Sequence, residues 1–143
     1  MSGSYPQFPI AKNAIPAMLK SHGIQTTAQR VEIAAILLAE KQHLSADQVL
    51  TRVSSGAAVS KATVYNTLGL FAERGLVRQV IVDSTKVFYD SNTEPHYHFY
   101  NVDDGTLTDV TADLVPIEHL PSAPAGTVTD GVDIVIRIRK EHS

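Results

Sequence analysis

The sequence predicts an α+β protein, in which an N-terminal winged helix-turn-helix domain is followed by a small α/β domain. Three observations lead to this prediction. Helix caps and apolar stripes recur between residues 13 and 75, a hairpin pattern follows over residues 76–89, and the formal charge changes sign at residue 90. Helices followed by a hairpin are typical of a winged helix-turn-helix unit.

The chain begins with residues 1–10, which hold two prolines and little periodicity, so we expect a flexible arm there. The winged-helix domain is expected over residues 11–90. Its first helix is expected from Asn13 to His22, with Gly23 supplying the left-handed stop. A second helix is expected to start at a capping box formed by Thr26 and Gln29. Its buried stripe is expected to hold Val31, Ala34, Ala35 and Leu38.

Two further helices are predicted by the same signals. Ser45 and Gln48 form a second capping box, and a third helix follows it. After a turn of small residues (54–58), Ser60 can cap a fourth helix that ends at Gly75. The apolar positions of the two helices are Val49, Leu50, Val53, Val64, Leu68, Phe71 and Ala72. Residues 76–82 and 86–89 are rich in β-forming residues and predict the hairpin.

A second domain is expected over residues 96–143, after a polar linker at residues 91–95 that ends in proline. Two strands are predicted around the turn at residues 103–105, a short helix within residues 111–119, and a third strand over residues 132–139, whose apolar residues alternate. A unit of about fifty residues buries little apolar surface on its own. We therefore expect it to be a dimerisation domain that completes its core against a second copy.

The two halves of the chain differ in charge, although the total is only −3. Residues 1–89 carry a net charge of +4 and residues 90–143 a net charge of −7. This asymmetry fits a nucleic-acid-binding module joined to a module of another purpose. The chain has no run of 18 apolar residues and its N-terminus lacks a signal-peptide pattern, so a cytoplasmic protein without a membrane partner is expected.

The start of the fourth helix is the candidate DNA-reading surface. Its apolar positions face the core, which leaves Ser60, Lys61, Thr63, Tyr65 and Asn66 near the N-terminal end. Lysine suits phosphate, asparagine can pair with adenine, and tyrosine can contact a thymine methyl group. The alternative is a solvated helix face with an incidental tyrosine.

The stretch from Asp90 to His98 is the candidate metal site. His96 and His98 occupy alternate positions, so in a strand they project from the same face. Two imidazoles and the Asp90 carboxylate form a nitrogen and oxygen ligand set that suits a divalent transition metal. Because this set lies between two domains, it indicates a switch rather than an enzyme.

Four motifs resemble the ferric uptake regulator superfamily and occur in its order: residues 26–30, 62–68, 75–77 and 96–98. The Tyr-Asn-Thr-Leu form, the His-Tyr-His-Phe-Tyr run and the closing alternating strand look most like its iron response regulator branch. The resemblance implies a homodimer, or a higher oligomer, that binds AT-rich inverted-repeat DNA and regulates iron and haem genes, as a repressor. Family members often have arginine where this chain has Asn66.

The resemblance also implies a five-ligand metal site. Its members would be His43, Asp90, His96, His98 and Asp109, which suit Fe(II), Mn(II) or Zn(II). The metal would clamp the two domains of the dimer. Haem is an alternative ligand, through His96, Tyr97 or His98, because histidine and tyrosine both serve as axial ligands.

Two metal sites of the family are altered or missing. The chain has no cysteine, so the structural zinc site of the family, whose first cysteine pair would fall at Asn101 and Asp104, cannot form. His119 lies near a ligand position of a second family site, but the usual partner falls at Pro116, so a structural role is expected for His119.

Two alternative functions remain at the level of sequence. The Asp90, Asp109 and His-Tyr-His residues also resemble the peroxide-sensing branch of the same superfamily, a metal-dependent repressor. A small Fe(II) enzyme is the remote alternative, since two histidines and a carboxylate can support oxygenase chemistry. The charge asymmetry and the order of helices and hairpin have no explanation in such an enzyme.

Overall fold

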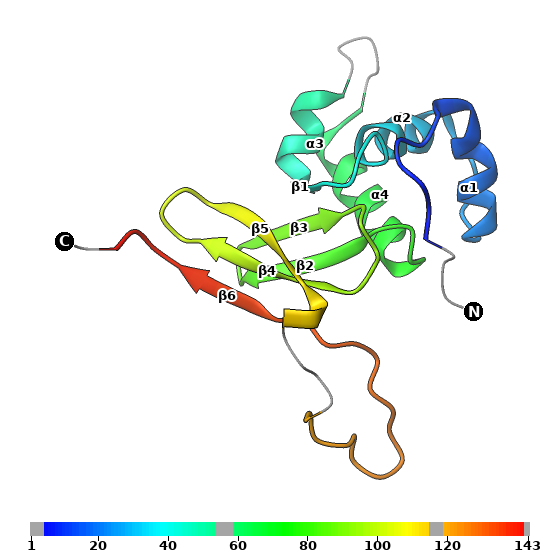
Figure 1. The fold of residues 1–143 in the computed structure, drawn as a ribbon. Helices are drawn as coiled ribbons and strands as arrows, with labels where there is room; N and C mark the ends of the chain where they lie inside the picture. The colour runs from blue at the N-terminus through cyan, green and yellow to red at the C-terminus, as the bar shows by residue number, and fades with distance from the viewer. Residues whose placement is uncertain (1–4, 54–58, 115–118, 142–143) are drawn as a thin grey trace. The chain divides into compact units, whose positions relative to one another are not determined.

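The computed structural model describes residues 5–53, 59–114 and 119–141 and divides the chain into two compact units. The first unit ends at Glu94 and the second begins at Pro95. Helices and a three-stranded sheet make up the first unit, and a three-stranded sheet makes up the second (Figure 1). The α+β class and the order of a winged-helix unit followed by a small sheet unit are confirmed.

The first unit contains a 3-10 turn at Lys12–Ala14 and four helices: α1 Ile15–Ser21, α2 Ala28–Leu37, α3 Ala46–Arg52 and α4 Lys61–Glu73. The predicted capping box at Ser45 is confirmed, with both Gln48 hydrogen bonds present. Ser60 caps α4 by accepting a hydrogen bond from the amide of Thr63. The predicted stops are confirmed as well, since Gly23 and Gly75 adopt φ values of 72° and 77°.

The predicted cap of α2 was wrong by one residue. Thr27, not Thr26, has the extended backbone of an N-cap, and its side chain accepts from the amide of Arg30. Gln29 lies three residues after Thr26, whereas Arg30 lies three residues after Thr27, so the capping-box pattern selected the wrong threonine. The predicted buried stripe is confirmed at Ala34 and Leu38, whereas Val31 and Ala35 are only partly buried and Ile33 and Leu37 are buried in addition.

A continuous core lies beneath these helices. Its fully buried side chains include Ile15, Leu19, Val49, Val64, Leu68 and Phe71. Each such side chain contributes roughly 1.5–3 kcal/mol by leaving water. Because Val64, Leu68 and Phe71 are buried, one face of α4 packs against the core and the opposite face is left exposed to solvent.

The sheet of the first unit has the order β1-β3-β2 and is antiparallel. It consists of β1 His43–Ser45, β2 Arg78–Asp83 and β3 Lys86–Asp90. The hairpin of β2 and β3 was predicted, and its turn is held by Asp83, whose Oδ1 accepts from the amide and hydroxyl of Thr85 at 2.8 and 2.9 Å. β1 was not predicted, because three residues are too few to show strand periodicity.

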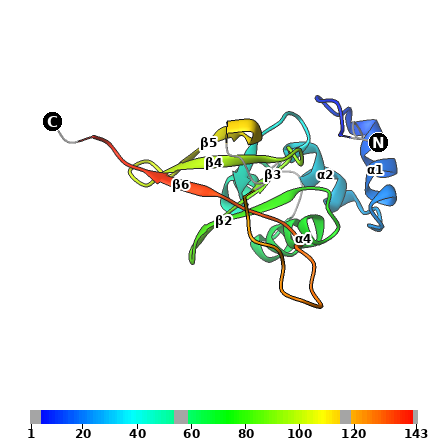
Figure 2. The ribbon, with the colours of Figure 1, turned by 60° about the horizontal axis from the view of Figure 1, so that its bottom comes forward.

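The second unit contains β4 His96–Asn101, β5 Thr106–Thr111, a 3-10 turn at Ala112–Leu114 and β6 Val135–Ile138. β4 lies in the middle, antiparallel to β5 and parallel to β6 (Figures 1 and 2). The last strand is shorter than predicted, and Ile136 and Ile138 are each 38% exposed. The short helix expected within residues 111–119 falls partly outside the described residues.

The segments expected to be a loose arm and a linker carry ordered contacts where they are described. Phe8 and Ile10 pack against the core of the first unit, and the amide of Ile10 donates to Leu38 O. Ser91 is buried and belongs to the first unit. Across the described parts of the chain, no helix is both long and apolar enough to span a bilayer.

Candidate metal centre and nucleic-acid interface

The second unit gathers three ligand-type side chains on one face of its sheet. His96 and His98 alternate along β4, so their imidazoles project from the same face. Asp109 on β5 is the cross-strand partner of His98, and His96 pairs with Thr111 two positions further along β5. The antiparallel register therefore places one carboxylate opposite one histidine and diagonal to the other.

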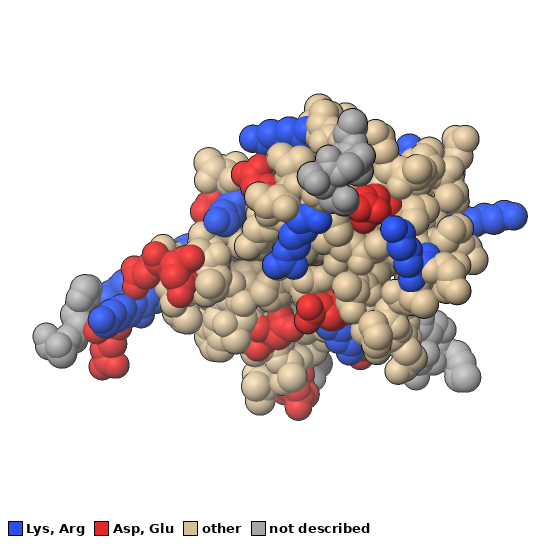
Figure 3. Space-filling model, turned by 90° about the horizontal axis from the view of Figure 1, so that it is seen from above, with Lys and Arg blue, Asp and Glu red and all other residues tan. Residues whose placement is uncertain are grey.

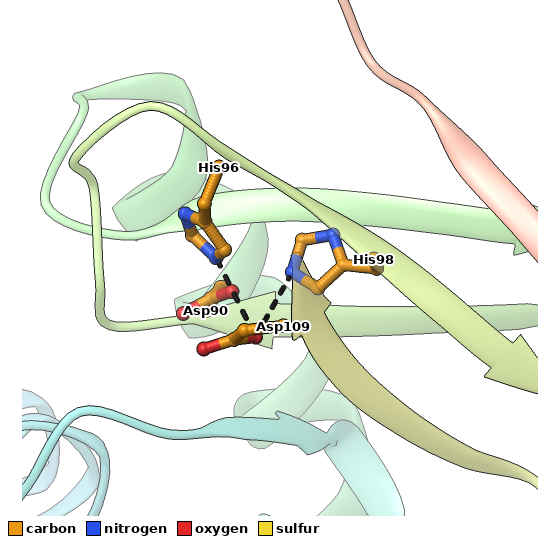
Figure 4. A group of neighbouring side chains, drawn as sticks. All are labelled: Asp90, His96, His98 and Asp109. Atoms are coloured by element: carbon orange, nitrogen blue, oxygen red, sulfur yellow. Dashed lines mark ion pairs between the residues drawn. The ribbon is translucent and has the colours of Figure 1, made fainter. Parts of the chain in front are cut away.

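The distances among these side chains are short. One oxygen of Asp109, Oδ1, lies 3.6 Å from Nε2 of His98 and 3.8 Å from Nε2 of His96 (Figure 4). The two imidazole rings have their centroids 4.6 Å apart and meet edge to face. Each of the three residues offers a ligand atom within 4.8 Å of the others.

This geometry fits a divalent metal. Zinc bonds of about 2.0–2.1 Å in a tetrahedral site place neighbouring ligand atoms about 3.4 Å apart. Asp109 Oδ1 and the two Nε2 atoms would reach that separation after movements of a few tenths of an ångström. His96 and His98 are buried while Asp109 is half exposed. The amide of His98 donates to Ile134 O, which ties this residue to the segment leading into β6.

The remaining two predicted ligands lie in the first unit. His43 opens β1 and Asp90 ends β3, and the two are direct cross-strand partners. Asp90 is 1% exposed, and its Oδ1 accepts from the amide of Asn92 at 2.9 Å. His43 is half-buried, with its ring edge-on to Phe88 at 6.1 Å.

A hydrogen-bond network that the sequence analysis missed supports this strand pair. The hydroxyl of Ser91 donates to Glu40 O at 2.7 Å and accepts from the amide of Gln42 at 3.0 Å. The amide of Ser91 donates to Gln42 O at 2.9 Å. Ser91 and Gln42 directly adjoin Asp90 and His43, so the network fixes the backbone beside both side chains. One serine within a polar stretch gives no sequence signal for this role.

The candidate haem ligands do not share one face. Tyr97 lies between His96 and His98 on β4, so its side chain projects from the opposite face of the sheet, where it is 4% exposed. One haem therefore cannot use Tyr97 and the histidine pair on the same side of this strand. His119 is exposed, and its suggested partner position, Pro116, lies outside the described residues.

The candidate DNA-reading residues occupy the first turns of α4. The hydroxyls of Ser60 and Thr63 are 2.9 Å apart, and both residues take part in capping the helix. Lys61, Tyr65 and Asn66 are exposed on the face opposite the core. Seen from above, Lys and Arg side chains project from several points, with acidic side chains between them (Figure 3).

Asn101 and Asp104, which stand at the expected positions of the first cysteine pair of the structural zinc site, make hydrogen bonds within the β4–β5 turn. Asn101 Oδ1 accepts from the amides of Asp103 and Asp104 at 2.9 and 3.4 Å. The hydroxyl and amide of Thr106 hold the pKa of Asp104 below its usual range. The amide of Lys140 donates to Asp103 Oδ2 at 2.7 Å, which ties the segment after β6 to the β4–β5 turn.

Known proteins similar to this chain are named as repressors and regulators. A peroxide-responsive repressor of Staphylococcus aureus is 32% identical over 94 residues, which is 65% of this chain and 64% of that protein. The chain thus matches slightly less than two thirds of the length of this relative. All the named relatives are regulators, which leaves the remote enzyme alternative without support.

Solved structures give the same fold. The ferric uptake regulator of Pseudomonas aeruginosa with manganese superposes with a TM-score of 0.70 and 26% identity, covering 93% of this chain and all of that one. A peroxide stress regulator of Campylobacter jejuni superposes with a TM-score of 0.59 and 23% identity over 88% and 96% of the two chains. The model of the ferric uptake regulator family matches residues 21–126, so this chain belongs to that family.

Proposed function

We propose that the protein is a metal-responsive, DNA-binding transcriptional regulator that acts as a homodimer and represses genes of metal homeostasis. The observation that carries this proposal is the group of His96, His98 and Asp109 in a chain whose first unit is a winged helix. The metal-bound structure of the Pseudomonas aeruginosa relative supports it.

The proposed switch joins the ligands of the two units on one metal ion. Asp90 and His43 would contribute from the first unit, and His96, His98 and Asp109 from the second. Only six residue steps separate Asp90 from His96, which limits their Cα separation to roughly 20–22 Å even in a fully extended chain. Fe(II), Mn(II) and Zn(II) all suit this mixed nitrogen and oxygen set, with affinity rising toward zinc.

Metal would favour DNA binding by fixing the two units. A dimer presents two copies of α4, and these read successive major grooves only at one spacing. The metal acts by binding the arrangement that is competent for DNA more tightly than other arrangements. To turn this arrangement from a rare to the dominant state, the difference in metal-binding free energy must be about 5 kcal/mol. AT-rich inverted-repeat DNA is the proposed target.

A titration tests the proposal. Binding to an AT-rich inverted-repeat duplex is measured without oxygen and at fixed salt, with Mn(II), Fe(II), Zn(II) and haem in turn. We expect metal to strengthen binding, and the double variant His96→Ala with His98→Ala to lose the response. His119→Ala is the matched control, because it removes an exposed imidazole from the same unit. A metal response that survives in the double variant would show that the site is misassigned.

A peroxide sensor is the second candidate, favoured by the similarity to the Staphylococcus aureus repressor. In that case Fe(II) at the same site would direct oxidation of a ligand histidine. Peroxide treatment of the Fe(II)-loaded protein should add one oxygen atom to His43 or His98, as read by mass spectrometry of peptides. The Mn(II)-loaded protein is the control, and equal oxidation in both forms would exclude this function.

A further inference from the structure

The DNA-reading end of α4 carries a contact that its proposed role does not explain. Asp47, in the first turn of α3, places its Oδ1 3.3 Å from the hydroxyl of Tyr65, which donates to it. The same oxygen lies 3.7 Å from the ammonium of Lys61. One carboxylate oxygen thus engages two of the residues expected to contact DNA.

Lys61 and Tyr65 are also in contact with each other. They lie four positions apart on α4, and the ammonium of Lys61 sits 5.7 Å from the centroid of the Tyr65 ring. Residues with this spacing share one face of a helix. Asp47, Lys61 and Tyr65 therefore form a three-membered polar cluster on the outer surface of α3 and α4.

Stability of the fold does not account for this cluster. The side chains of Lys61 and Asp47 are 64% and 67% exposed, and Tyr65 is 43% exposed. Ion pairs at such exposure contribute little, because water and salt screen them. A negative charge at this place also repels the phosphates of DNA, which is a cost to binding at any sequence.

We propose that Asp47 is a specificity-determining residue of the DNA-reading surface. Its charge offsets that of Lys61 and so weakens the attraction to the phosphate backbone, which all sequences share. Its oxygen holds the Tyr65 hydroxyl and so fixes the aromatic ring that reads a base edge. Asp47 thus lowers non-specific affinity more than specific affinity. This inference rests on the proposed function of DNA binding.

Two substitutions separate the effects of charge and position. Asp47→Asn removes the charge but keeps an oxygen that can accept from Tyr65, whereas Asp47→Ala removes both. Glu32→Gln is the control, since Glu32, on α2 of the same unit, lies 3.3 Å from the ammonium of Lys12, with side-chain exposures of 26% and 66%. It removes one negative charge without touching α4.

The measurement is binding of the Mn(II)-loaded 143-residue chain to two duplexes of equal length, an AT-rich inverted repeat and a GC-rich sequence, over a series of salt concentrations. For Asp47→Asn on the GC-rich duplex, we expect the slope of log affinity against log salt to steepen by about 0.9, as one further phosphate contact would give. Between 1 M and 0.1 M salt, that slope corresponds to about an eightfold gain in affinity. The ratio of specific to non-specific affinity should fall, and fall further in Asp47→Ala.

The outcomes distinguish this inference from the proposed function. If the wild-type protein binds neither duplex, the proposed function fails. If it binds but Asp47→Asn leaves the slope and the affinity ratio unchanged, or if Glu32→Gln changes them equally, the role of Asp47 is refuted. Adding Lys61→Ala to Asp47→Asn should restore the wild-type slope, and failure to do so would also overturn the role.

Discussion

Replacing Asp109 with asparagine should remove most of the stabilisation that metal gives to this protein. The substitution keeps the shape of the side chain and takes away the charge of the oxygen that lies between the two Nε2 atoms. The side chain is 50% exposed, so the metal-free protein should be nearly as stable as the wild type.

The magnitude follows from ligand linkage. Metal at one hundred times its dissociation constant stabilises the folded state by about 2.7 kcal/mol. Removal of a hydrogen-bonding neighbour of a metal ligand typically costs 10–100-fold in affinity, and we take about 100-fold for loss of the ligand charge itself. The same metal concentration then equals the new dissociation constant and gives only about 0.4 kcal/mol.

Thermal unfolding with and without Mn(II) provides the assay. A single transition for 143 residues carries an unfolding entropy of about 0.3 kcal/mol/K, so Tm should rise by about 9 °C in the wild type and by about 1 °C in Asp109→Asn. Asp113→Asn makes the same change of charge at an exposed residue of the same unit and should keep the full rise. A full rise in Asp109→Asn would refute the assignment of Asp109 as a ligand.

Three further predictions concern the fold around the two sites. Gly69 lies inside α4 with open space where a Cβ would be, so Gly69→Ala should raise the free energy of unfolding by about 1 kcal/mol in denaturant titrations; a loss of stability would contradict this. Asn101→Ala deprives two turn amides of their acceptor and should cost about 1 kcal/mol, whereas a neutral result would show that water replaces the side chain fully. The Thr85 amide and hydroxyl hold the pKa of Asp83 below its usual range, so Asp83 should stabilise the hairpin above about pH 4 and lose this effect as the pH falls through the lowered pKa. The difference in stability between wild type and Asp83→Asn should therefore shrink in acid, and a constant difference from pH 3 to 7 (about the range that brackets this titration) would refute the role.

The helices and the hairpin of the first unit could be predicted because their signals are local. Ser45 and Gln48 satisfy each other's backbone within four consecutive residues, and Gly75 ends α4 through its own φ angle. The residues that make such interactions are close together in the sequence, so a sequence pattern can reveal them. At α2 the capping-box pattern of Thr26 and Gln29 pointed to the wrong residue, because the observed N-cap, Thr27, has no Gln or Glu three residues later.

The grouping of His96, His98 and Asp109 depends on pairing across strands. Alternation along β4 already put His96 and His98 on one face, but only the register with β5 places Asp109 beside both. The sequence predicted a strand around Asp109, but only the family resemblance pointed to Asp109 as a partner of the histidine pair. The position of Asp47 beside Lys61 and Tyr65 likewise depends on the packing of α3 against α4, 14 and 18 residues apart in the chain.

By itself, then, the sequence determined the class of fold, the capped helices, the absence of thiolate ligands and the alternating histidines, since each depends on residue type and on spacings of a few residues. Tertiary structure decided which threonine caps α2, that His43 and Asp90 face each other on β1 and β3, and that Ser91 is buried against the loop before β1. These features depend on packing and hydrogen bonds between segments that are distant in the sequence, and such contacts form only when the chain has folded.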